Sequence, residues 1–432
     1  MMGLLMALPA AAQFGGFGGP SVLSRGSGMP GRSAGRPIRF RPYVGISGFY
    51  QSGSDAFFRD GVVGNYGSMA NFGLVGNSTG KRDFGAVSYS GNHLVAGSNA
   101  LNTTNHSVNA TYGRQVNSRW TTFVGAGASL TDLLSFNMQT PVSDVPSAQL
   151  VNPSLQLFDT RAYQFSSAGG LSYQKSARTS FSVSGGAFTM QFREPGFVDT
   201  NAYSSQGSVF YLLNRREGIG ATYSFTIFDF RKEFGDGQIH NWSVGYQRAL
   251  SARWSLSASG GVYRLESNRL AQVAVDPLIA ALTGQTTVVE ALHSINQGVS
   301  SEVSIQGRFR RSGIGLQYSR GIMPGNGVFL TARQDTVQGH YSYTGLRTWN
   351  LGLFASYAKF SAMTQDLAPF KSSNAGFGAS RRLTSILHFT ANAGFITSDI
   401  SRSVTHMGFR NDRYIATVGF QLSPGEFPLS LF

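Results

Sequence analysis

One short phrase recurs along the chain where one run of alternating residues ends and the next begins. It starts with an aromatic residue, carries a basic residue two positions later, passes through small polar residues and ends on another aromatic. The clear copies are YGRQVNSRW (112–120), YQKSARTSF (173–181) and YQRALSARW (246–254), and SRRLTSILHF (380–389) is a looser one. Amphipathic rings favour the boundary between water and lipid, while a short polar turn favours water. The phrase therefore predicts the hairpins of a transmembrane β-barrel.

The composition agrees with a sheet that has one face in lipid and the other in water. Only 13% of the residues are charged, about half of the ~25% usual in soluble domains. Hydrophobic residues make up 41%, and no stretch of ~18 or more consecutive apolar residues occurs, so a membrane-spanning helix is excluded. The composition is also uniform after about Arg41, which argues against several linked domains.

Runs with a period of two follow the phrase and are roughly 10 to 14 residues long, as tilted membrane strands require. Between 254 and 262, for example, Trp254, Leu256 and Val262 share one face and three serines share the other. The pattern predicts an all-β, antiparallel, up-and-down barrel of about eighteen strands. Sixteen is the fallback, because the first two strands fall in a Gly- and Asn-rich region. The expected strands are 40–50, 66–77, 82–93, 103–115, 119–131, 160–174, 179–192, 202–214, 219–232, 239–250, 253–266, 296–310, 313–323, 333–345, 348–361, 373–383, 386–398 and 406–422.

The expected connections alternate between tight turns and long loops, the longest of which are 132–159 and 267–295. Short turns belong on the periplasmic side of an outer-membrane barrel and long loops on the outside. Residues 1–12 have the apolar run and small residues of a secretory signal peptide, although a basic start is missing. Residues 13–37 are rich in Gly, Ser, Pro and Arg and are expected to form a flexible periplasmic tail.

The alternating strands, the asymmetry of the connections, the aromatic-flanked turns and the terminal Phe432 resemble a bacterial outer-membrane β-barrel of the porin-like type. The resemblance covers roughly residues 40 to 432, within a transmembrane barrel expected over 38–432, and implies location in the outer membrane, contact with its lipid and insertion by the barrel assembly machinery. It leaves homo-oligomerisation open. Pro424 and Pro428 depart from the class, because proline cannot donate a hydrogen bond to a strand ladder. Either the last strand stops near Leu422, or Phe432 is not the assembly signal that it resembles.

A barrel of this size encloses an aqueous channel unless something fills it. We expect passive diffusion of small hydrophilic solutes through a lumen lined by Ser, Thr, Gly, Asn and Gln; the candidate charged or polar lining residues are Glu302, Gln306 and Arg308. The loop 267–295 is a candidate constriction, with Asp276 and Pro277 starting a short helix and with Glu290 and His293 beyond it; an ordinary external loop is the alternative. A closed or plugged barrel with a structural, adhesion or envelope-interaction role is the other functional hypothesis.

Much of the net charge of +14 lies at the tight turns and predicts a basic periplasmic rim. Its candidate members are Arg114, Arg119, Lys175, Arg178, Arg248, Arg253, Arg381 and Arg382. The rim is expected either to attract anions or, as we prefer, to anchor strand ends at lipid headgroups. Binding of nucleic acid is a poor match, because the arginines alternate with lipid-facing aromatics.

Candidate catalytic and metal-binding patterns are weak. The seven histidines form no HxxxH or HxH pair, no GxSxG motif is present, and the chain has no cysteine. We therefore expect neither an enzyme nor a resident metal or cofactor.

Overall fold

The computed structural model describes residues 38–52, 65–80, 82–97, 102–132, 161–193, 198–230, 235–274, 287–324, 331–363, 369–400, 409–423 and 427–429. The predicted signal peptide and tail lie outside these residues. None of the described residues belongs to a helix long and apolar enough to cross a membrane. The strands are β1 (Ile38–Ser52), β2 (Asn65–Thr79), β3 (Asp83–Ala96), β4 (Thr103–Gln115), β5 (Trp120–Asp132), β6 (Arg161–Gln174), β7 (Thr179–Phe192), β8 (Thr200–Leu212), β9 (Glu217–Phe230), β10 (Gly235–Ala249), β11 (Trp254–Ala274), β12 (Thr287–Arg308), β13 (Ser312–Pro324), β14 (Thr331–Tyr343), β15 (Trp349–Ala362), β16 (Phe370–Arg382), β17 (Leu387–Ile400), β18 (Phe409–Leu422) and β19 (Phe427–Leu429).

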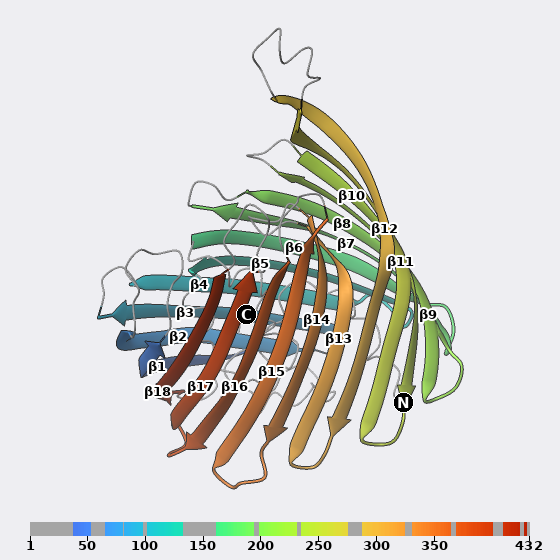
Figure 1. Ribbon diagram of the computed structural model, residues 1–432. Coiled ribbons are helices and arrows are strands. Elements are labelled where there is room, and N and C mark those ends of the chain that lie inside the picture. The colour runs from blue at the N-terminus through green and yellow to red at the C-terminus, as the bar shows by residue number, and fades with distance from the viewer. Residues whose placement is uncertain are drawn as a thin grey trace.

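The eighteen long strands form one closed antiparallel barrel (Figure 1). Each strand from β1 to β17 pairs with the next one in sequence, and β18 pairs back with β1 from Val44↔Leu422 to Ser52↔Tyr414. Closure leaves no free edge among the long strands, which a sheet in lipid requires because the hydrocarbon offers no hydrogen bonds. The prediction of an all-β up-and-down barrel with eighteen strands is confirmed, including the two strands of the Gly- and Asn-rich region.

The prediction of a loop over 267–295 is wrong at both of its ends. Strand β11 continues to Ala274 and β12 begins at Thr287, so the two are 21 and 22 residues long. They pair in register throughout, and above the barrel wall they form the tall hairpin at the top of Figure 1. Polar residues in this extension resemble a loop in the sequence, but they bond across the hairpin: the side chains of Ser267 and Ser294 are joined by a hydrogen bond of 2.8 Å.

At the carboxyl end of the chain, the alternative in which the last strand stops near Leu422 is the one that the structure shows. Strand β18 ends at Leu422, as the prolines require, and a three-residue strand, β19, then pairs with the beginning of β1. Pro428 lies opposite Arg39 in that short strand. A proline is tolerated in a short edge strand of this kind, although it cannot donate to the ladder.

The recurring phrase forms tight turns of one design. In the first copy, the Asn117 side-chain oxygen accepts hydrogen bonds from the backbone N–H groups of Arg119 and Trp120, at 2.8 and 2.9 Å. Ser251 and Thr384 accept the equivalent pair of bonds in two other turns, at 3.0 to 3.3 Å. Such side-chain acceptors stabilise turns by satisfying backbone donors locally. The small polar residue of the phrase is therefore the part that closes each turn.

Candidate functional site: the interior of the barrel

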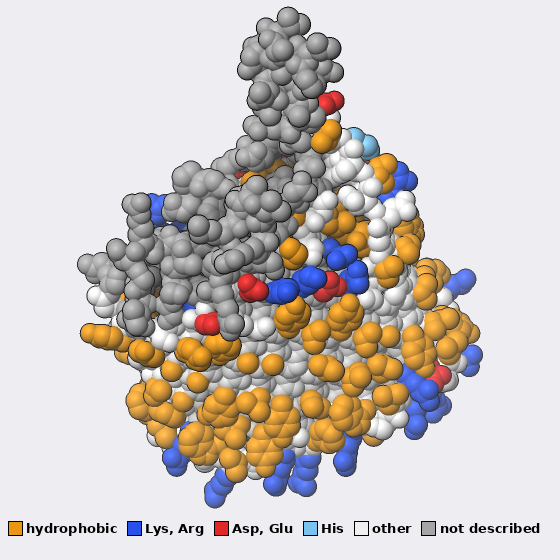
Figure 2. Space-filling view, viewed as in Figure 1, with side chains coloured by type: hydrophobic (Ala, Val, Ile, Leu, Met, Phe, Trp, Pro, Cys, Tyr) orange, Lys and Arg blue, Asp and Glu red, His pale blue; other side chains and the backbone are white. Residues whose placement is uncertain are grey.

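The outer face of the barrel carries a continuous apolar belt. Side chains such as Ile46, Val183 and Val244 are 64 to 68% exposed, and each alternates with a residue that points inward. Figure 2 shows the belt as a broad band of hydrophobic side chains, with Lys and Arg side chains along its lower edge. Exposed apolar surface on this scale is far beyond the largest patch of a soluble monomer. The belt is the surface that contacts lipid.

Aromatic rings mark the lower edge of the belt. Trp120, Tyr173 and Phe181 lie opposite one another on three neighbouring strands, and the ring centroids of the first two are 4.5 Å apart. The guanidinium of Arg381 lies 5.4 Å from the centroid of the Trp349 ring. Amphipathic rings of this kind prefer the lipid-water interface. The tight turns also lie at this edge, and short turns are periplasmic, so the lower edge is the periplasmic boundary of the membrane.

The inward face of β11 and β12 is polar and open to solvent. Ser255 and Ser257 are exposed although they face away from lipid, and the structure places Glu302, Gln306 and Arg308 on the inward face of β12, all of them exposed. Gln317 on β13 donates a hydrogen bond of 3.0 Å from Nε2 to a carboxylate oxygen of Glu302. Its own Oε1 accepts a bond of 2.7 Å from Nε2 of Gln338. This wall has the chemistry of an aqueous lumen.

Aromatic rings on the inner wall lie over glycines of the neighbouring strand. A Cβ atom added to Gly298 on β12 would collide with the phenol of Tyr263 on β11, and one added to Gly376 would collide with the ring of Phe354. The same relation holds for the pairs Tyr43 and Gly73, Phe84 and Gly113, Phe123 and Gly170, and Phe210 and Gly218. Glycine at these positions lets the ring lie against the backbone of the next strand. The sequence, with its 54 glycines, gave no direct sign of this pairing.

Near the long-loop end, the inward face becomes apolar. We call the residues concerned the apolar collar; its buried members are Phe49, Met69, Leu94, Ala96, Ala162, Met190, Phe192, Ala202, Phe228, Phe230, Ile239, Leu265, Ala332, Ala358, Phe360, Phe370, Ile396 and Ile415. Phe228, Phe360 and Phe370 have no exposed surface. One cluster joins side chains of β8 to β11 with Ile322 of β13, although these strands are not neighbours of β13 in the sheet. The collar side chains therefore project into the interior far enough to connect strands that are not paired.

At the collar, the inward face of a strand changes from polar to apolar. On β9, the inward side of the strand runs from Thr222, Ser224 and Thr226 to Phe228 and Phe230. We did not predict the collar, because alternation alone identifies the two faces of a strand without showing which lies inward at each height. The change from small polar to large aromatic residues on one face, within a single strand, was the available signal.

All eight predicted rim residues are exposed, and all lie in or beside the tight turns. Arg248 forms an ion pair of 3.0 Å with Glu217, and Arg114 approaches Asp83 at 3.6 Å. Both pairs join outward-facing side chains of adjacent strands. This geometry favours anchoring at the membrane boundary over attraction of solutes.

The four candidate constriction residues do not come together as a site. Asp276 and Pro277 lie outside the described residues. Glu290 and His293 belong to the paired extension of β12, where Nδ1 of His293 lies 2.8 Å from the side-chain oxygen of Asn268. These two residues thus belong to a hairpin above the wall and not to an infolded loop.

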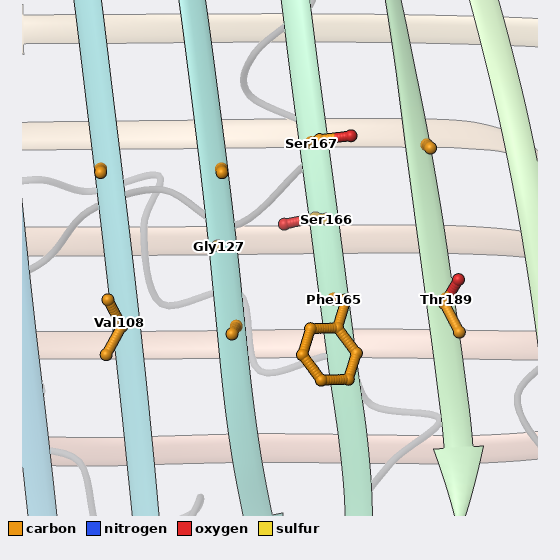
Figure 3. Close-up of a pocket in the computed structure, with 10 residues that line it drawn as sticks. Val108, Gly127, Phe165, Ser166, Ser167 and Thr189 are labelled. Atoms are coloured by element: carbon orange, nitrogen blue, oxygen red, sulfur yellow. The ribbon is translucent and has the colours of Figure 1, made fainter.

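A shallow depression of about 390 Å³ lies across β4 to β7. Its floor is formed by small residues such as Ala110, Ala126 and Ala187, with Val108 and Phe165 at one side (Figure 3). Most of these side chains belong to the outward face, so the depression opens toward lipid. It is therefore separate from the lumen.

Among the residues that the structure describes, no group of three or more His, Cys, Asp or Glu is placed to hold a metal ion.

The closed barrel, its apolar belt and its aromatic boundary define an outer-membrane β-barrel of porin-like architecture. The solved structures to which it is similar include a BenF-like porin from Pseudomonas fluorescens Pf-5, with a TM-score of 0.43, 12% identity and coverage of 89% of this chain and 98% of that one. They also include the outer membrane protein OpdK from Pseudomonas aeruginosa, with a TM-score of 0.41, 12% identity and coverage of 89% and 99%.

The ferric-catecholate import receptor Fiu from E. coli is similar to the same degree, with a TM-score of 0.41, 7% identity and coverage of 88% and 81%. Likenesses at this level do not bear on substrate or mechanism. No family model matches the chain, and no curated protein matches it.

Proposed function

We propose that the protein is an outer-membrane channel through which small hydrophilic solutes diffuse passively. The observation that carries the proposal is the solvent exposure of Ser255 and Ser257 on the inward face of the wall. A side chain that faces away from lipid and is still exposed borders a space that water can fill. The proposal includes no catalytic step and no resident cofactor.

The size of the barrel supports the same reading. Eighteen strands about 4.8 Å apart and tilted by about 40° have a circumference of about 113 Å, which corresponds to a backbone diameter of about 36 Å for a circular section. Side chains of Ser, Thr, Gly and Asn are too small to fill a bore of that width. Barrels with 16 to 18 strands accordingly contain aqueous channels when nothing plugs them.

We further propose that the apolar collar forms the narrowest section of the path. Its rings lie on the inward face at the long-loop end, and its contacts join strands that are not neighbours in the sheet. An apolar constriction limits passage by size and by the ease with which it is wetted. Barrel insertion by the assembly machinery and homo-oligomerisation remain predictions of the resemblance.

The collar also favours the second candidate function, a closed barrel with a structural or adhesive role, because Phe360 and Phe370 have no exposed surface. Purified folded protein in planar bilayers separates the two functions. A channel gives stepwise conductance and permits swelling of liposomes in small sugars. A closed barrel gives neither, and a conductance that arises only after deletion of residues 13–37 would identify the tail as a plug.

A further inference from the structure

A row of charged residues crosses five neighbouring strands on the outer face of the barrel. Arg320 on β13 lies opposite Asp335 on β14, which lies opposite Lys359 on β15. Lys359 in turn lies opposite Lys371 on β16, and Lys371 lies opposite Asp399 on β17. Residues directly opposite on one face have Cβ atoms about 4.5 to 5.5 Å apart, so the row is continuous.

The row lies at the upper edge of the apolar belt. Leu316 and Tyr357 are outward-facing, 54% and 40% exposed, and precede Arg320 and Lys359 on the same strands by four and two residues. Tyrosines at this position prefer the lipid-water interface. Figure 2 shows Lys, Arg, Asp and Glu side chains side by side above the belt. The row is therefore at the depth of the lipid headgroups, on the side of the long loops.

The row carries more positive charge than negative charge. The carboxylate of Asp335 is shared, at 3.5 Å from Nε of Arg320 and 3.8 Å from Nε of Arg333. Neither Nε atom makes a hydrogen bond, although both are buried. Four cations, Arg320, Arg333, Lys359 and Lys371, therefore lie along the row with two acids, Asp335 and Asp399, and Asp399 also lies opposite Arg410 on β18.

Lys359 and Lys371 are the members of the row with the fewest favourable contacts. Like charges directly opposite in a sheet are destabilising. Within the part of the chain that the structure describes, neither lysine ammonium has a hydrogen bond or ion pair. An anion between the two lysines would remove the repulsion, and it would lie one strand away from Arg333 and two strands away from Arg320.

We propose that this row binds the phosphate groups of the anionic glycolipid in the outer leaflet, that is, the lipid A part of lipopolysaccharide. Phosphate is the anion that lies at this depth of the membrane, and both guanidinium and ammonium groups bind it well. The lipid would lie against the belt with its acyl chains and against the row with its phosphates. The site is on the outside of the wall and does not depend on conduction through the lumen.

The test is titration of the full-length folded protein in detergent with bis-phosphorylated lipid A, read by native mass spectrometry. Replacement of both lysines, Lys359→Gln with Lys371→Gln, is expected to weaken binding about 30-fold, from the usual contribution of a basic residue near an anionic membrane surface. The matched control is Arg308→Gln with Arg413→Gln, which removes the same charge from inward-facing positions on β12 and β18, out of reach of a lipid on the outer face, and is expected to bind like the unaltered protein. Lipid A without phosphates is expected to bind the unaltered protein as weakly as the lysine variant binds the phosphorylated lipid.

Three results would overturn the proposal: unchanged binding by the lysine variant, equal loss in the inward-facing control, or full competition by inorganic phosphate at the concentration of the lipid, which would indicate a site for a free anion. Folding of each variant is checked by the heat-dependent shift in electrophoretic mobility. If the double variant does not fold, Lys371→Gln alone gives the same reading. The conservative pair Lys359→Arg with Lys371→Arg is expected to retain binding.

Discussion

Cysteine substitution on two adjacent residues of β11 tests the assignment of lumen and lipid faces. The native chain has no cysteine, so an introduced thiol is the only one present. Ser257 faces inward and is exposed, whereas Ala258 faces outward within the belt. We expect Ser257→Cys to react with a membrane-impermeant maleimide when the protein is reconstituted in liposomes, and Ala258→Cys to be protected.

The expected difference between the two reaction rates follows from the depth of Ala258 in the membrane. Ala258 is four residues above Trp254, and a rise of about 3.3 Å per residue at a tilt of about 40° places it about 10 Å above the aromatic boundary. The apolar band is about 25 Å tall, so the outward position is near its centre. The thiolate is the reactive form of cysteine, and placing an ionised group at this depth costs about 2.5 to 3.5 kcal/mol. That cost lowers the population of the thiolate about 70- to 370-fold.

The rate of modification, followed by mass spectrometry of stopped samples, should therefore be about 70 to 370 times greater for Ser257→Cys than for Ala258→Cys. Both variants should react equally after unfolding in denaturant, which is the control for intrinsic reactivity. Equal rates in the folded protein would refute the assignment of faces. A folded Ser257→Cys protein that stays unreactive would instead show that the lumen is closed to water.

Three further substitutions probe the wall, the collar and a turn by equilibrium unfolding in urea. Gly298→Ala should destabilise the barrel by about 1 to 3 kcal/mol, because the new methyl group displaces a ring, whereas Gly260→Ala, with no atom within 4 Å of the added Cβ, should not. Phe360→Ala should cost about 3 to 5 kcal/mol through the cavity that it leaves. Asn117→Ala should cost about 1 kcal/mol by freeing two backbone donors, and Ser118→Ala in the same turn should have no measurable effect.

Much of the fold could be predicted because a membrane strand shows its two environments in its sequence. Trp254 to Val262 alternates between lipid and water with almost no exception, and the aromatic turn phrase fixes where each hairpin begins. The prediction failed where the environment changes along one strand. Above the belt the outer face of β11 meets water, so Glu266 and Asn268 alternate with Leu265 and Ser267, and the strand looks like a loop.

The site could be predicted less well than the fold, because its features depend on which strands are neighbours. Glu302 could be assigned to the lumen from alternation alone, but its partner Gln317 is 15 residues away and was not predictable from one strand. The pairing of Tyr263 with Gly298 likewise joins residues 35 positions apart, from the register of β11 and β12. Period-two patterns describe faces, whereas such contacts require register.

The reversal of polarity along the strands reflects two environments of one sheet: its lower section is surrounded by lipid and its upper section by water. Within the belt, apolar residues face out and small polar residues face in, because lipid is outside and water is inside. Above it, on β15, Ser356 gives way inwardly to Ala358 and Phe360 while the outward face changes from Tyr357 to Lys359. That upper section has the pattern of a soluble sheet, whose stability comes from burying its inner face. The collar is therefore the core of the extracellular part of the barrel and, as proposed above, its narrowest section, so substitutions that widen the passage there should also lower the stability of the protein.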